Sequence, residues 1–336
     1  GAVIPCCRRP ARGPASTFSR DAPVITELTS TRANHLVDPA LHVWGWEIPV
    51  YLFLGGLVAG MMVIAGYFLL SGRGRRTDCV CFLLPGLGLV LLSLGMLALF
   101  LDLEHKPYFW HLYTTFLPTS PMSWGAWILV LVYPALLLNL LLRLPEALRR
   151  VLPPLAAWSD RLGAVPGVAR IVGGANVGLG VLLGIYTGVL LSAMGARPLW
   201  NSALLGPLFL TSGLSSAAAF VHMVARDPDE RVLLAKADNT FLALELVLIG
   251  LFLVGLVSAT RVHVAAAGLF LGGPFTAAFW VGVVGLGIVV PLFVQTLAVR
   301  HKVAHTPVAP VLVIAGGLLL RFVIVYAGQL SRWTLA

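Results

Sequence analysis

Eight long apolar stretches constrain the fold of this chain more than any other feature of its sequence. Each is close to the twenty residues that a helix needs to cross the hydrocarbon core of a bilayer. They fit at about residues 46–70, 80–101, 124–142, 171–193, 199–224, 237–257, 277–299 and 309–330. With 58% hydrophobic and 11% charged residues, the chain lies far outside the composition of soluble proteins. We therefore predict an all-α polytopic membrane protein with about eight transmembrane helices, with two four-helix bundles as the expected arrangement.

The first forty residues differ from the rest of the chain. Residues 1–40 hold Arg, Pro, Ser and Thr and no sustained apolar run, which predicts an extended N-terminal tail without a core of its own. No apolar segment follows the early arginines, so we do not expect a cleavable signal peptide. Residues 41–336 are expected to form one eight-helix transmembrane domain.

Basic residues are distributed unevenly among the segments that join the apolar stretches. About thirteen lysines and arginines lie in the connections after the first, third, fifth and seventh stretches, against about three in the other connections. Connections rich in Lys and Arg stay in the cytoplasm, so we expect both termini and residues 102–127 on the opposite, periplasmic side. This topology accounts for the formal net charge of +9 and gives no reason to expect a nucleic-acid partner.

Ionisable side chains inside apolar stretches are costly and indicate function by default. Glu245 lies near the middle of its stretch, and Arg321 lies in the outer half of the last one. We interpret both as functional candidates that face the interior of the helix bundle or a water-filled cavity. His222 and Asp238 lie near predicted cytoplasmic helix ends, a position more typical of the membrane interface. Two alternatives remain for Glu245 and Arg321: a pairing that only holds helices together, and the midplane site of a secondary transporter.

The segment from Asp102 to Trp127 interrupts the apolar sequence with acids, histidines, aromatics and prolines. This composition indicates a folded surface rather than a tether, although aromatics at helix ends also serve as membrane-interface anchors. Carboxylates, imidazoles and phenols could exchange the two protons that accompany oxidation or reduction of a quinone. We therefore predict a quinone head-group site on the outer side of the membrane, surrounded by Glu47, Asp102, Glu104, His105, His111, Tyr113 and Tyr186.

The sequence offers no pattern typical of a bound metal, haem or iron-sulfur cluster. Its four cysteines, at positions 6, 7, 79 and 81, lack the spacing of zinc or cluster ligands. Haem between transmembrane helices needs facing axial ligands, and His222 is the one histidine predicted inside a span. We thus expect neither haem nor clusters in this chain, and electrons must come from a partner. An inert anchor that only docks such a partner is a further alternative.

Several motifs in fixed order resemble the NrfD-like membrane subunits of polysulfide reductase and related respiratory complexes, across nearly all eight stretches. The first is Trp-Glu-Ile-Pro-Val-Tyr-Leu-Phe-Leu-Gly-Gly at residues 46–56. The others are Asp102-Leu103, Phe109-Trp110, Pro-Thr-Ser-Pro-Met-Ser-Trp-Gly at 118–125, Tyr-Thr-Gly-Val-Leu-Leu at 186–191 and Pro-Leu-Trp-Asn at 198–201. The sequence departs from the family where Glu104-His105-Lys106-Pro107 replaces a common Gly-Arg-Pro, and either Lys106 or His105 is expected to take the place of the usual arginine.

This resemblance implies a haem-free subunit in the bacterial inner membrane that binds menaquinone or ubiquinone near the periplasmic face. It implies two partners: a four-cluster ferredoxin-type iron-sulfur subunit on that face, and a molybdopterin catalytic subunit. By position, Tyr186 is similar to the quinone-contacting tyrosine of the family, and Glu47 and Asp102 fall among residues lining the same pocket. His105, His111 and Tyr113 are further head-group candidates. Glu245, Arg321 and Asp102 are candidates for proton transfer, with proton translocation as an implied activity.

Overall fold

The computed structural model describes residues 44–72, 83–144, 146–225, 227–299 and 307–333. The predicted tail and the four cysteines lie outside these ranges. All regular elements in the described ranges are helical, and eight helical spans are long and apolar enough to cross a membrane. The chain is thus a multi-pass membrane protein. Its spans are α1 (Glu47–Leu70), α2 (Leu83–Asp102), α4 (Pro121–Leu142), α7 (Val168–Ser192), α8 (Leu205–Val224), α9 (Pro228–Val257), η4 (Ala278–Val289) joined to α11 (Val290–Val299), and α12 (Val308–Leu330).

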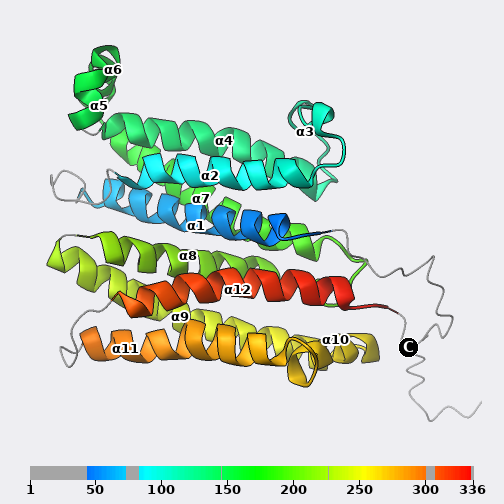
Figure 1. Cartoon of the computed structure of the whole chain (residues 1–336). Helices are drawn as coiled ribbons and strands as arrows, with labels where there is room; N and C mark the ends of the chain where they lie inside the picture. The colour runs from blue at the N-terminus through cyan, green and yellow to red at the C-terminus, as the bar shows by residue number, and fades with distance from the viewer. Residues whose placement is uncertain (1–43, 73–82, 145, 226, 300–306, 334–336) are drawn as a thin grey trace, which may run out of the picture.

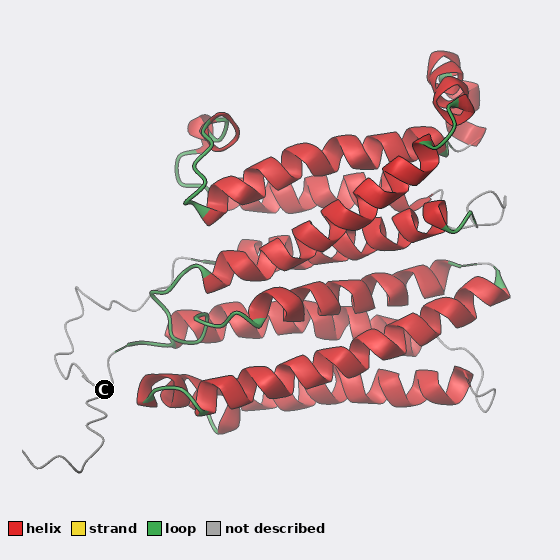
Figure 2. Ribbon diagram, turned by 180° about the vertical axis from the view of Figure 1, so that it is seen from behind, coloured by secondary structure: helices red, strands yellow, loops and turns green. Residues whose placement is uncertain are grey.

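The long helices run side by side in two groups of four (Figure 1). One group contains α1, α2, α4 and α7, and the other contains α8, α9, η4 with α11, and α12. The view from behind shows the same two layers of helices (Figure 2). Helix α1 packs on α2 and α7 in its own group and on α8 and α12 in the other group. It is the most buried of the eight spans, which explains why it is apolar on all sides.

Glycines let α1 approach its neighbours closely. A Cβ atom at Gly60 would lie 2.6 Å from the carbonyl oxygen of Gly213 on α8. A Cβ atom at Gly66 would lie 2.6 Å from the carbonyl oxygen of Gly173 on α7. In lipid, no hydrophobic driving force brings helices together, so their association depends on close van der Waals packing. Small residues allow that packing because the two backbones can approach each other. The Gly60 contact brings the two bundles together, and the Gly66 contact holds α1 against α7 within the first bundle.

Several predicted span boundaries differ from the structure; α8, for example, begins at Leu205, six residues after the predicted start at 199. Helix α9 begins at Pro228, nine residues before the apolar run that starts at Ala237. Its start is fixed by the Asp227 side chain, which accepts a hydrogen bond from the Asp229 backbone N–H at 3.0 Å. Helix α4 likewise begins early, with Pro121 in its first turn. Both helices therefore extend beyond the membrane-length apolar segment.

Five short elements connect the spans. Between α2 and α4 lie η3 (Lys106–Tyr108) and α3 (His111–Thr114), which fold the aromatic segment into a compact structure. After α4 come α5 (Glu146–Val151) and α6 (Pro153–Ala164), and α10 (Arg261–Leu271) follows α9. The start of α1, the end of α12 and α3 lie at one end of the bundle, and α5 and α6 lie at the other (Figure 1). The described ends of the chain, at Trp44 and Trp333, therefore lie at the same end of the bundle as the aromatic segment, and the periplasmic position of this end stays a prediction.

Candidate functional site

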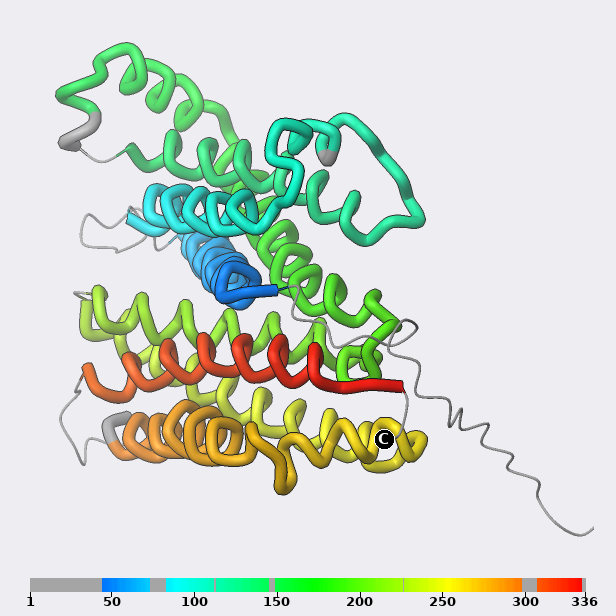
Figure 3. Tube along the Cα trace, turned by 45° about the vertical axis from the view of Figure 1, so that its right-hand side comes forward, coloured from blue at the N-terminus to red at the C-terminus, as the bar shows by residue number. Residues whose placement is uncertain are grey.

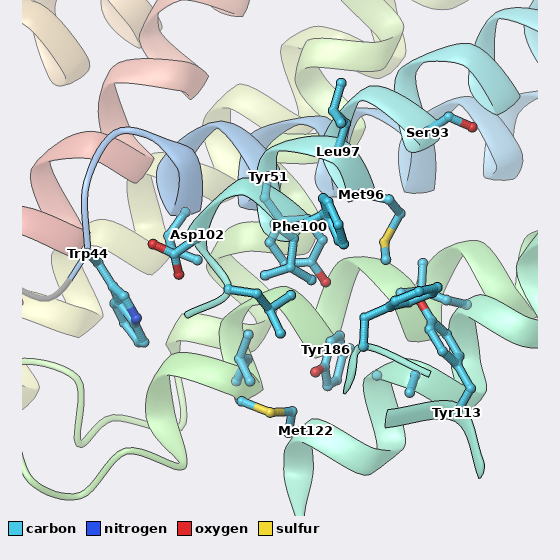
Figure 4. Close-up of a pocket in the computed structure, with 18 of the residues that line it drawn as sticks. Trp44, Tyr51, Ser93, Met96, Leu97, Phe100, Asp102, Tyr113, Met122 and Tyr186 are labelled. Atoms are coloured by element: carbon cyan, nitrogen blue, oxygen red, sulfur yellow. The ribbon is translucent and has the colours of Figure 1, made fainter. Parts of the chain in front are cut away.

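A cavity of about 540 Å³ lies within the first bundle, near the end that carries α3. Helices α1, α2, α4 and α7 form its walls, and the segment between α2 and α4 closes one side (Figure 4). Its volume falls in the range of small-molecule sites. Apolar side chains dominate the lining, and the Ser93 and Tyr133 hydroxyls in it lie 3.3 Å apart in a hydrogen bond. The side chains that bring hydroxyl or carboxylate groups to the wall are Tyr51, Ser93, Asp102, Tyr113, Tyr133 and Tyr186.

Tyr186 on α7 is buried and faces the cavity (Figure 4). Its ring lies against Gly125 on α4, where a Cβ atom would overlap the phenol. The glycine therefore leaves the space that the tyrosine ring occupies. The sequence motif that ends in Gly125 and the predicted head-group tyrosine belong to one packing unit, although they lie sixty-one residues apart in the chain.

Three further tyrosines line the cavity. Tyr51 is a buried residue of α1, one helical turn after Glu47, and lies close enough to Tyr186 and Tyr113 to interact electrostatically with them. Tyr113 is half-buried in α3; burial raises the pKa of its phenol, and the nearby Tyr133 raises that pKa further. A phenol with a raised pKa keeps its proton at neutral pH. The wall therefore presents hydroxyl groups that can donate a hydrogen bond to a carbonyl oxygen.

Two carboxylates lie near the rim of the cavity. Asp102, the last residue of α2, is part of the lining, and its carboxylate lies on the Trp44 side of the cavity (Figure 4). Glu47, the first residue of α1, is half-buried and is not part of the lining. It is near enough to Asp102 to interact with it electrostatically. Of these two acids, Asp102 could contact a ligand in the cavity directly, whereas Glu47 could act through its electrostatic interaction with Asp102.

The predicted histidines do not reach the cavity. His105 and His111 are exposed, and neither is part of the lining. His111 stacks on Trp110 with ring centroids 3.7 Å apart. The fold of η3 and α3 turns Phe109 and Tyr113 inward and leaves these two imidazoles outside. The histidines were predicted from residue type and neighbourhood, whereas the direction of each side chain depends on the turns of this connection. Glu104 is exposed as well.

The two bundles meet at the edge of the cavity through Trp44. Trp44 lines the cavity and stacks on Trp200, with ring centroids 5.1 Å apart. Its backbone N–H donates to Gln329 Oε1 at 3.1 Å, and Gln329 Nε2 donates to its carbonyl oxygen at 3.1 Å. Gln329 lies on α12, and the Trp200 indole donates to the carbonyl oxygen of Ile324 on the same helix at 3.0 Å. Residues of the second bundle thus fix the position of Trp44, which lines the cavity of the first bundle.

A second polar cluster lies between α8, α9 and α12. Arg321 is fully buried; its guanidinium donates to the carbonyl oxygens of Gly317 at 2.8 Å and Phe209 at 2.9 Å, and to the Ser212 hydroxyl. The Ser212 hydroxyl also contacts the buried carboxylate of Glu245, which feels the charge of Arg321. Ser212 therefore connects the two predicted intramembrane charges.

The cluster continues along α9 to Asp238. Asp238 lies seven residues before Glu245 and is fully buried, not interfacial as its predicted position near a helix end suggested. The early start of α9 explains the difference, because it places Asp238 about three turns inside the helix. The Ser215 hydroxyl donates to its carboxylate at 2.8 Å and the Gln295 amide donates at 2.7 Å. Two hydrogen bonds offset part of the cost of burying this acid in an apolar surrounding.

Comparison with known proteins places this arrangement in a family. A family model described as "Polysulphide reductase, NrfD" matches residues 34–331. The chain belongs to the NrfD family. It is 34% identical over 325 residues to the protein NrfD of Escherichia coli, covering 90% of this chain and 99% of that protein. It is 31% identical over 308 residues to a polysulfide reductase chain from Wolinella succinogenes, covering 85% and 94%.

A more distant relative has a different named reaction. A selenate reductase subunit from Mesobacillus selenatarsenatis is 25% identical over 313 residues, which cover 84% of this chain and 73% of that protein. The NrfD match covers every residue of the cavity wall and of the polar cluster around Ser212. Within the described part of the chain, no three His, Cys, Asp or Glu side chains come together as a metal site would require.

Proposed function

We propose that this protein is the quinone-binding membrane subunit of a respiratory oxidoreductase complex. The observation that carries the proposal is the cavity of about 540 Å³, lined by four tyrosines, Ser93 and Asp102 within a largely apolar wall. This combination suits a ligand with an apolar body and carbonyl oxygens at its head. Family membership supports it, since relatives are named as parts of polysulfide and selenate reductases.

The side chains divide the work at the head group. Tyr186 and Tyr51 donate hydrogen bonds to the ring oxygens from two different helices, and Asp102 at the rim passes protons between the cavity and the surface. Quinone supplies the two-electron chemistry when it is bound. We propose that menaquinone or ubiquinone is the ligand, and that Glu47 adjusts the charge around Asp102 rather than contacting the ligand. His105 and His111 have no part in this arrangement.

Electrons reach the cavity from a partner. The sequence lacks the cysteine pattern of an iron-sulfur protein, so a cluster that relays electrons to the cavity belongs to another subunit. We propose an iron-sulfur subunit of the four-cluster ferredoxin type, seated over α3, and a molybdopterin catalytic subunit beyond it. The distribution of basic residues supports a periplasmic position for α3 and thus for both partners, with the complex in the bacterial inner membrane.

The second cluster suits proton movement. Glu245, Ser212 and Arg321 form a connected set at membrane depth, and Asp238 extends it along α9 toward the connection with α8. Groups of this kind inside a membrane commonly serve proton relays. We propose that the cluster carries protons during turnover. The transporter interpretation is less well supported, because the cavity that could hold a small molecule lies in the first bundle, away from Glu245 and Arg321.

Quinol turnover by the Tyr186→Phe variant tests the proposal. The substitution removes one hydroxyl and preserves the ring, so the variant should assemble normally while its turnover with a soluble quinol analogue falls about tenfold, the effect of one lost hydrogen bond to a reacting group. Tyr67→Phe is the matched control, because Tyr67 lies on α1 with an exposed side chain. Equal turnover of both variants and the wild type would remove Tyr186 from the site.

A further inference from the structure

Helices α5 and α6 leave the bundle at the end opposite the cavity. They lie beyond the end of α4, outside the bundle of long helices (Figure 3), and extend across the direction of these helices (Figure 1, Figure 2). Arg149 on α5 and Asp160 on α6 form an ion pair that ties the two helices together. A helical pair oriented in this way lies along the membrane surface when the spans cross the bilayer.

The exposed surface of this pair combines apolar and basic residues. Trp158 is 61% exposed and Val151 is 75% exposed, as expected for side chains that enter the boundary between head groups and acyl chains. Arg161 and Arg170 are exposed nearby. Residues 143–170 contain five arginines against two acids. Apolar side chains with an excess of arginine are typical of a helix that rests on an anionic lipid surface.

A buried cation lies where this pair joins the bundle. Arg143 follows the last residue of α4 and is only 9% exposed, and its Nη1 atom has no hydrogen-bond partner among the described residues. Burial lowers the pKa of its guanidinium to about 10, so the group stays charged at neutral pH. One turn earlier, Asn139 is fully buried, and neither its amide nitrogen nor its carbonyl oxygen has a partner there. A buried charge without a partner is costly in any protein interior.

We propose that Arg143 and the α5–α6 pair bind the phosphate head group of an anionic phospholipid. The phosphate supplies an acceptor and a counter-charge for the Arg143 guanidinium, whose Nη1 atom has no partner among the described residues. Arg161 and Arg170 add long-range attraction for the negative surface. Trp158 and Val151 enter the lipid layer beside the head group. The site is separate from the cavity, because Arg143 is not part of the cavity lining and the α4 residues of that lining end at Tyr133, ten residues earlier.

Native mass spectrometry of the purified complex tests this site. The complex is released from nanodiscs that contain phosphatidylcholine with phosphatidylglycerol of the same acyl length, and the lipid retained per complex is counted. We expect retention of phosphatidylglycerol over phosphatidylcholine, and we expect Arg143→Gln to reduce that retention about tenfold, as for loss of one charge-assisted hydrogen bond. Arg332→Gln is the matched control, since it removes an exposed arginine at the other end of the bundle.

The outcomes distinguish a specific lipid site at Arg143 from nonspecific attraction of anionic lipids to basic residues. Equal loss in Arg143→Gln and Arg332→Gln, or unchanged retention in Arg143→Gln, overturns the proposal. If Arg143→Gln does not assemble, the wild-type comparison decides, because equal retention of the two lipids also overturns it. Inorganic phosphate added in excess should leave the bound phosphatidylglycerol in place. Displacement by phosphate alone would indicate a site for a soluble anion and would equally contradict a lipid site.

Discussion

The Tyr186 ring occupies space that only a glycine at position 125 leaves open. A Cβ atom on Gly125 would overlap the phenol, so α4 and α7 meet with no room for a further group between them. This contact sets how far the Tyr186 hydroxyl reaches into the cavity. The position of Tyr186, the proposed hydrogen-bond donor to the head group, therefore depends on Gly125, which has no side chain to contact a ligand.

Gly125→Ala should displace Tyr186 and lower quinol turnover about tenfold or more. Overpacking of this kind costs about 1–3 kcal/mol when neighbours cannot shift freely. Gly178→Ala on α7 is the matched control, because a Cβ atom there meets nothing within 4 Å. Turnover of both variants with a soluble quinol analogue is the measurement. Wild-type activity in Gly125→Ala would show that the tyrosine can move without loss of function.

Gln329→Ala should weaken quinone binding although Gln329 itself does not line the cavity. The change removes both hydrogen bonds that hold the Trp44 backbone, each 3.1 Å long. We expect the KM for quinol to rise about fivefold, as for about 1 kcal/mol of lost positioning, with kcat nearly unchanged. Asn201→Ala removes an exposed amide at the same end of the molecule and serves as the control. A fall in kcat at constant KM would contradict a role of Gln329 in quinol binding.

Glu245→Gln should separate electron transfer from proton movement. The substitution keeps the shape of the side chain and removes its ability to release a proton, at a position away from the cavity. In proteoliposomes, we expect proton uptake or release per turnover to fall several-fold while the KM for quinol changes less than about twofold. The exposed acid Glu104 provides the control variant Glu104→Gln. A purely weaker affinity for quinol in Glu245→Gln would contradict a proton-path role.

Gln295→Leu should destabilise the second bundle. Asp238 would lose the donor at 2.7 Å and keep only the Ser215 hydroxyl. Hydrogen bonds between transmembrane helices contribute about 0.5–2 kcal/mol each, so the free energy of unfolding should fall by that amount. Thermal unfolding in a fixed detergent is the measurement. Asn239→Leu removes a longer hydrogen bond, of 3.4 Å to Thr296, and should lower the free energy of unfolding less. An equal decrease in both variants would show that the hydrogen bond from Gln295 to Asp238 contributes no more than an ordinary polar contact.

The spanning helices were largely predictable because each needs about twenty apolar residues to cross a bilayer, and such runs are visible in the sequence. The exceptions follow from signals other than apolar length. The capping aspartate and proline at Asp227 and Pro228 start α9 well before its apolar run. Residues 143–170 lie between two predicted spans and were expected only to connect them, whereas α5 and α6 form there.

The site was predictable only in part. Tyr186, Asp102 and Tyr113 were selected from residue type and family resemblance, and all three line the cavity. Tyr51 and Tyr133 were not selected, because a tyrosine within an apolar span gives no sign of which helix face it occupies. A spacing of four residues from Glu47 could have identified Tyr51 as a member of the same face. The direction of each tyrosine depends on packing among helices distant in sequence.

The most direct test of the account is to purify the complex from its native membrane and measure bound quinone by solvent extraction. We predict about one menaquinone or ubiquinone per protein, as for a single site of this volume. The same preparation of Tyr186→Phe should retain less quinone with its partner subunits still attached. An intact complex that contains no quinone, or one whose quinone content does not respond to Tyr186→Phe, would contradict the assignment of this cavity.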